Sequence, residues 1–274
     1  MIKRIAAAFE FLTIIPLPFK RADSHVWDES GIGRSSSVFP VVGLIMGSAY
    51  FLCYAALKYV LPIEVCAVVV ILVGAVITGG LHLDGVSDTF DALAAKRTPT
   101  DRLLIMKSGA AGPIGVAAIV LTLLLKYALL KNLLMNAQIS SAFVLLTYPA
   151  AGRFAATAAM FTGKSARSEG LGCIFIEHTG AKEFSLAAGF MFLIVTLLNL
   201  SLNTGCGVPC VSFHSIAIII IIAVAAKISG SFFLKRFGGL TGDTLGAFIE
   251  VSELIFLIYL TITTGGHLCQ RGFI

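Results

Sequence analysis

Long apolar stretches recur along almost the whole chain, and they restrict its fold more than any other feature. At about 20 residues each, they are long enough to cross the hydrocarbon core of a bilayer as helices. We expect seven spans, near 38–60, 62–81, 110–131, 138–161, 184–202, 212–234 and 245–264. Only 13% of the residues are charged, about half the share found in soluble domains. The chain is therefore predicted to be an all-α, polytopic membrane helix bundle.

The N-terminal segment differs from a cleaved signal peptide. Lys3 and Arg4 precede an apolar run, but Glu10 interrupts this run and no small-residue cleavage site follows it. We expect an uncleaved interfacial helix that ends at Pro16–Pro18. Segment 20–37 is polar and rich in serine, and we expect it to be a surface loop.

Basic residues are distributed unevenly between the two sides of the predicted bundle. With seven alternating spans, 15 of the 20 Lys and Arg residues fall on one side, and Glu64 is the only acidic residue on the other side. Because basic loops remain in the cytoplasm, we predict an inner-membrane protein whose polar chemistry faces the cytoplasm. The net charge of +5 is modest, so it favours this explanation over nucleic-acid binding.

Residues 79–97, GGLHLDGVSDTFDALAAKR, contain three carboxylates at spacings of four and three residues. These spacings place Asp84, Asp88 and Asp91 on one face of a helix. Carboxylates on one face repel each other unless a cation lies between them, so we predict a divalent metal site. The alternative is an exposed, solvated helix turn.

The residues around this acidic face suit the chemistry of phosphate esters. Four basic residues follow it, namely Lys96, Arg97, Arg102 and Lys107. Beside a bound metal, they are predicted to hold a phosphorylated substrate, although the positive-inside rule alone also explains them. His82 is predicted to contact the substrate as a ligand or a base. A histidine at a membrane border is more often a hydrogen-bonding residue.

A second acidic segment, KRFGGLTGDTLGAFIEVSE, covers 235–253. Its glycines form a flexible loop before the last span, and we expect Thr241 and Gly242 to bind a phosphate where the helix begins. Asp243 shares a helix face with Glu250, seven residues further on. A simple helix cap is the alternative role for Asp243.

Glu250 and Glu253 lie inside an apolar span, where a carboxylate is costly. We expect them either to bind metal or to pair with a base such as Arg153. The glycine-rich segment at 163–172, which contains Glu169, is either a substrate lid or an ordinary loop.

Several segments together resemble one enzyme family. They are AFEFLTIIPLP near the N-terminus, FPVVGLIMG at 39–47, GGLHLDGVSDTFDAL, GRF at 152–154, SARSEGLG at 165–172 and GGLTGDTLGAFIEVSEL at 238–254. In this order they resemble the cobalamin synthases, the adenosylcobinamide-GDP ribazoletransferases of the late vitamin B12 pathway. The resemblance covers nearly the whole chain, and its two acidic motifs are specific.

The resemblance implies a single membrane-embedded catalytic domain over 1–274. It implies a Mg²⁺-dependent enzyme that joins α-ribazole, or its 5′-phosphate, to adenosylcobinamide-GDP and releases GMP. The other product is adenosylcobalamin or its phosphate. Positions on the family motifs or at recurrent family positions are Asp84, Asp88, Asp91, Arg153, Glu169, Thr241, Gly242, Asp243 and Glu250.

We combine the residues and the resemblance into three predicted groups. The Mg²⁺ ligands are Asp84, Asp88, Asp91 and Glu250. The catalytic residues are Asp91, Asp243 and Arg153, with one of the two aspartates accepting the proton of the ribazole hydroxyl. The substrate contacts are His82, Lys96, Arg97, Arg102, Lys107, Glu169, Thr241, Gly242 and Glu253.

The chain departs from the family pattern at MKSGAAGPIG, residues 106–115, where many members carry a charged pair before a glycine. Two other functions remain open. One is a CDP-alcohol phosphotransferase, although the Ala-Arg pair expected of that class does not follow the aspartates. The other is a cation transporter that uses Asp84 and Glu250. The sequence also leaves open whether the protein forms a homo-oligomer.

Overall fold

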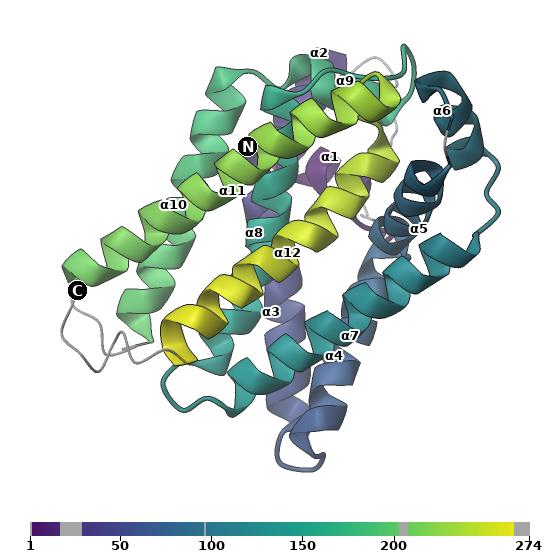
Figure 1. Cartoon of the computed structure of the whole chain (residues 1–274). Coiled ribbons are helices and arrows are strands. Elements are labelled where there is room, and N and C mark those ends of the chain that lie inside the picture. Colours follow the sequence, from purple (N-terminus) through teal and green to yellow (C-terminus); the bar gives the residue numbers. More distant parts are fainter. Residues whose placement is uncertain (1, 17–28, 96, 203–207, 266–274) are drawn as a thin grey trace.

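The computed structural model describes residues 2–16, 29–95, 97–202 and 208–265, and this part of the chain is a helix bundle without strands (Figure 1). The first helices are α1 (Ile2–Leu12), α2 (Glu29–Gly33), the 3-10 helix η1 (Arg34–Val38), α3 (Phe39–Leu57), α4 (Ile63–Thr78), α5 (Leu81–Ala94) and α6 (Pro99–Lys107). They are followed by α7 (Pro113–Met135), α8 (Ser141–Thr162), α9 (Leu171–His178), α10 (Ala181–Ser201), α11 (Val208–Phe237) and α12 (Gly242–Gly265).

Helix α8 lies at the centre of the bundle, packed against α3, α10, α11 and α12. Nearly all of its residues are buried, and most of them are small. Gly43 and Gly47 of α3 face its backbone so closely that a Cβ on either would lie within about 2.6 Å of α8 backbone atoms. This is the small-xxx-small packing by which membrane helices approach each other.

By length and apolar composition, five helical segments of the described residues are able to cross a membrane, or six if α4 and α5 form one broken span. The outer faces of α7 and α11 expose mainly Leu, Ile and Val, as expected for contact with lipid. The predicted polytopic helix bundle is confirmed. The remaining predicted span corresponds to α8, which is not among these segments because it is rich in Ala and Thr and carries Arg153 in its interior.

Two glycines break the second long apolar stretch. Gly79 and Gly80 both have positive φ, at 62° and 75°, and their N–H groups close the end of α4 by donating to Val76 and Ala75. Helix α5 then leaves at 88° to α4. A left-handed pair of this kind favours glycine, because a Cβ is strained there. The turn redirects the acidic segment towards α12 and α7.

The segment before α3 corrects one prediction. Residues 20–37 were expected to form a surface loop, but residues 29–37 form α2 and most of η1, and Ser35, Ser36 and Ser37 are buried. The Thr157 and Thr179 hydroxyls donate to the backbone oxygen and the hydroxyl of Ser36, both at 2.8 Å. Residues 20–28 lie outside the described part. The serines here are interior hydrogen-bonding groups.

Polar groups gather at one end of the bundle, as predicted. This end contains the beginnings of α7 and α12, the end of α8, and the short helices α6 and α9 (Figure 1). Glu64 lies at the other end, where it pairs with Lys131 near the end of α7 at 2.9 Å.

Candidate active site

Two acidic segments that are far apart in the sequence meet where α5 packs against the first turns of α12. Asp84 and Asp88 of α5 lie near Asp243 of α12, and Gly85 between them permits the approach. A Cβ on Gly85 would lie 2.5 Å from the backbone oxygen of Asp243. The prediction that both acidic motifs lie at the same end of the bundle is confirmed.

The electrostatics of this acidic face favour a cation. Asp88 lies beyond the bend, on a helix that is not one of the five single spans. Partial burial and the negative charges of Asp84, Asp243 and Asp91 raise the pKa of Asp88 to about 6, against a weaker opposing effect of Arg167. A carboxyl group destabilised in its charged form by three neighbours gains most from a positive charge placed between them.

Asp243 is held in place by two neighbouring polar side chains. Arg167 donates from Nη2 to a carboxylate oxygen of Asp243 at 3.2 Å, and the Thr241 hydroxyl donates to the same oxygen at 3.4 Å. The N–H of Thr244 donates to the Thr241 hydroxyl, and the N–H of Thr241 donates to the Thr244 hydroxyl. Thr241 is therefore the cap of α12, and the cap role considered for Asp243 is wrong. The N–H groups of Thr241 and Thr244 are already used within this turn.

Asp91 is turned towards α7 instead of towards the other aspartates. Its two oxygens accept the backbone N–H groups of Gly112 and Gly115, at 2.7 and 2.8 Å. Gly112 directly precedes α7 and Gly115 lies in its first turn, where backbone N–H groups have no partner within the helix. The stretch that departs from the family pattern is thus the stretch that Asp91 caps.

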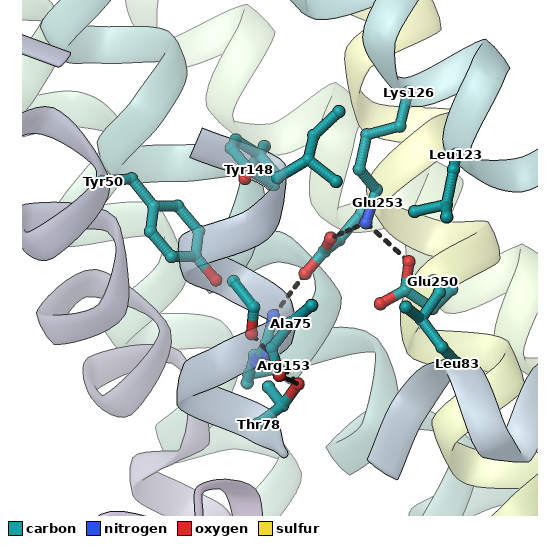
Figure 2. Close-up of a pocket in the computed structure, with 12 residues that line it drawn as sticks. Tyr50, Ala75, Thr78, Leu83, Leu123, Lys126, Tyr148, Arg153, Glu250 and Glu253 are labelled. Atoms are coloured by element: carbon teal, nitrogen blue, oxygen red, sulfur yellow. Dashed lines mark hydrogen bonds and ion pairs between the residues drawn. The ribbon is translucent and has the colours of Figure 1, made fainter. Parts of the chain in front are cut away.

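A charged network lies buried below the acidic face (Figure 2). Lys126 of α7 donates to Glu250 at 2.5 Å and to Glu253 at 2.7 Å, and Arg153 of α8 donates to the other oxygen of Glu253. All four side chains are less than 10% exposed. The two glutamates were expected either to bind metal or to pair with bases. The structure shows the pairing, because two cations here neutralise two anions.

His82 connects this network to α5. Its Nδ1 lies 3.3 Å from Nη2 of Arg153, and the side chain is buried. A guanidinium has only donors, so Nδ1 accepts and a neutral ring carries its proton on Nε2. The first turn of α5, which also contains Asp84, is thereby tied to α8.

A cavity of about 20 Å³ adjoins the network, with room for about one water molecule. Tyr50, Thr78 and Tyr148 line it together with the charged residues, and Figure 2 shows the Tyr50 hydroxyl turned towards it. Arg153 Nε is buried there without a hydrogen-bond partner among the described residues.

The remaining predicted substrate contacts are spread over the polar end. Arg102 is buried and donates to the backbone oxygens of Ala95 and Arg236, both at 3.2 Å, so its guanidinium joins α6 to α11. Arg97, Lys107 and Glu169 are exposed, and Gly242 begins α12. Lys96 lies outside the described residues.

The count of basic residues in the sequence placed Lys126 on the far side of the bundle, with Lys58, Lys131 and Arg271. The structure places it inside α7 as the partner of both buried glutamates, so that assignment is wrong. Its position within an apolar run was the available indication, because a lone lysine at membrane depth requires a counter-ion. Tyr50 and Tyr148 carried no comparable indication.

Within the described residues, no group of three or more His, Cys, Asp or Glu side chains is arranged to hold a metal ion by itself. Glu250 lies seven residues along α12 from Asp243, roughly 10 Å at the rise of a helix, and Lys126 engages it. Mg²⁺ commonly uses one or two carboxylates, waters and substrate phosphates instead of an all-protein cage. Asp84 and Asp88 fit that kind of site.

Comparison with known proteins gives the relatives of this chain. A family model described as cobalamin-5-phosphate synthase matches residues 4–261. An adenosylcobinamide-GDP ribazoletransferase of Geotalea daltonii is 34% identical over 97% of this chain and 100% of its own length. Proteins with the same name from Fusobacterium nucleatum and Escherichia coli are each 32% identical, over 93% and 95% of this chain and 95% and 100% of their own lengths.

No solved structure matches the chain at a significant level. The family match runs from the first turns of α1 almost to the end of α12, so it includes the acidic face, the buried network and every helix between them. The chain therefore belongs to the cobalamin-5-phosphate synthase family.

Proposed function

We propose that the protein is an adenosylcobinamide-GDP ribazoletransferase whose active centre is the acidic face formed by Asp84, Asp88 and Asp243. The observation that carries the proposal is the meeting of the two acidic segments between α5 and α12. Its support is the name shared by full-length relatives at 32–34% identity. The reaction joins ribazole, or its 5′-phosphate, to the corrinoid and releases GMP.

Asp84 and Asp88 would hold a Mg²⁺ ion at this face. When bound, such an ion neutralises the oxygens of the diphosphate in the GDP-activated substrate and makes GMP a better leaving group. The two aspartates would orient the ion. Asp91 fixes the beginning of α7 beside them, which is a positioning role given by its two hydrogen bonds to Gly112 and Gly115.

Asp243 is the residue to which we assign the proton of the attacking ribazole hydroxyl. It lies beside Asp84 and Asp88, and its interaction with Arg167 keeps the carboxylate in place. The buried network below holds α5, α7, α8 and α12 together by way of His82, Lys126, Arg153 and the two glutamates. We propose that this network sets the distance between the α5 carboxylates and Asp243.

The transporter alternative is weakened by the same network. It requires Glu250 as a cation ligand, but the Glu250 carboxylate already forms an ion pair with Lys126 at 2.5 Å. The glutamate already has a counter-ion within the protein.

The proposal is tested by GMP release from adenosylcobinamide-GDP and ribazole with protein in lipid nanodiscs. We expect Asp84→Asn to lower turnover by at least about a hundredfold, because a metal ligand contributes several kcal/mol to the transition state. Chelation should stop wild-type turnover and Mg²⁺ should restore it. Asp101→Asn is the matched control, since Asp101 lies at the same end but caps α6.

Two results would contradict the proposal in different ways. Near-normal GMP release by the Asp84 variant would show that the active site does not lie at the acidic face. Absence of GMP release by the wild-type protein with either form of ribazole would reject the function.

A further inference from the structure

A second cavity opens beside the acidic face, between the end of α8 and α9. Its volume is about 580 Å³, and its polar lining includes Lys164, Ser165, Arg167, Ser168 and Glu177. This is within the usual size range of small-molecule sites. We call it the 164–168 cavity.

The backbone of the 164–168 cavity is held firmly against the beginning of α12. Leu240 N–H donates to Lys164 O at 2.7 Å, and Ala166 N–H donates to Leu240 O at 2.8 Å, which forms an isolated parallel bridge. Gly239 packs so closely that a Cβ would lie 2.5 Å from Lys164 O. The cavity wall and Asp243 are therefore parts of one local structure.

Arg167 belongs to both sites. Its Nη2 donates to Asp243, while its buried Nε has no hydrogen-bond partner among the described residues, although the residue lines the cavity. A guanidinium offers five N–H donors in one plane, so it can hold Asp243 and still donate to an anion. Lys164 is exposed and makes no ion pair among the described residues, which leaves its charge available.

We propose that the 164–168 cavity binds the phosphate monoester of the ribazole substrate, with Lys164 and Arg167 as its ligands. The inference rests on the function proposed above. The diphosphate of the corrinoid nucleotide needs the cation at the acidic face. A second, non-reacting phosphate would be repelled by those carboxylates and requires its own positive charges close by. Arg167 supplies one beside Asp243, and Lys164 supplies another in the lining of the same cavity.

Glu177 makes it possible to test whether charge in the cavity changes phosphate binding in the expected direction. It is exposed and lines the same cavity, so its charge opposes a phosphate. Removing the lysine charge and removing the glutamate charge should therefore change phosphate binding in opposite directions. A purely structural role for this loop predicts no such opposition.

The experiment compares kcat/KM for ribazole 5′-phosphate with kcat/KM for free ribazole in nanodiscs, with GMP release as the readout. Lys164→Met should lower the ratio of the two constants by about tenfold, the effect of one charge-assisted hydrogen bond. Glu177→Gln should raise the ratio by about threefold. Lys235→Met is the matched control, an exposed lysine at the end of α11 that does not line the cavity.

Direct binding separates this inference from the proposed function. Ribazole 5′-phosphate should bind to the wild-type protein in chelator, measured by equilibrium dialysis, and Lys164→Met should weaken this binding by about tenfold. An unchanged ratio and unchanged binding in the Lys164 variant would overturn the assignment. So would an equal loss with both nucleophiles, or a rise only in the KM for the corrinoid nucleotide. If the wild-type protein binds the phosphate but releases no GMP, the proposed function fails and the binding site stands.

Discussion

Lys126 neutralises two carboxylates in the interior of this bundle. Its ammonium group lies between Glu250 and Glu253, and Arg153 completes a set of two cations and two anions. Buried charges are tolerated when they are paired and hydrogen-bonded, but removing one partner leaves an uncompensated charge. The cost of losing Lys126 is therefore set by the glutamate charges that remain.

We expect Lys126→Met to lower the free energy of unfolding by about 3–5 kcal/mol, because it strands two glutamates in the interior. Lys131→Met is the matched control on the same helix. Its partner Glu64 is 45% exposed, so the loss should stay below about 1 kcal/mol. Denaturation of the purified protein in detergent measures both, and equal losses would contradict the buried ion network.

At this scale the sequence predicted that the glutamates are costly and need partners, and it suggested Arg153. It did not reveal Lys126, because spacing along one chain shows which residues share a helix face but not which face of another helix they meet. Asp91 illustrates the same limit. Its spacing places it with Asp84 and Asp88, but the beginning of α7 supplies two N–H groups that engage its carboxylate.

Helix α5 is the element on which the site depends, and its contact with α12 is made through Gly85. The backbone oxygen of Asp243 occupies the space that a side chain on Gly85 would need. Any larger residue must therefore push the two helices apart, and with them Asp84, Asp88 and Asp243.

We expect Gly85→Ala to reduce turnover at least about tenfold, since displacements of about 1 Å in a catalytic arrangement carry costs of that order or more. Gly189→Ala in α10 is the control. A Cβ there meets no atom within 4 Å, and alanine is the better helix former, so its stability should be unchanged or slightly higher. GMP release and unfolding are measured for both variants. Normal turnover by Gly85→Ala would show that the helix contact does not set the site.

The long helices were the most predictable elements, because apolar runs of about 20 residues specify them directly. The predicted span at 38–60 corresponds to α3, which begins at Phe39. The buried serines of η1 were missed, since polarity in a sequence predicts exposure unless interior partners such as Thr157 and Thr179 are known. The 88° angle between α4 and α5 at Gly79–Gly80 was not predicted either, because an apolar pattern does not report the direction of a helix.

For the whole molecule, the proposed orientation has a direct test that needs no substitution. The polar end, with the acidic face and the 164–168 cavity, should face the cytoplasm, because most basic residues lie there. The charged substrates do not cross membranes. GMP release should therefore occur with inside-out vesicles and be nearly absent from intact right-side-out vesicles, until detergent opens them. Equal rates in both preparations before detergent would contradict this orientation.

The buried network also has a consequence for the order in which the protein is made. Lys126 precedes Glu250 and Glu253 by 124 and 127 residues, and Arg153 precedes Glu253 by 100. During synthesis both cations leave the ribosome long before the carboxylates that neutralise them. A lone charge at membrane depth is costly, so α7 and α8 cannot settle in their final positions until α12 is inserted. The arrival of the last helix both neutralises the interior and brings Asp243 to α5, so a nascent chain has no partial active site.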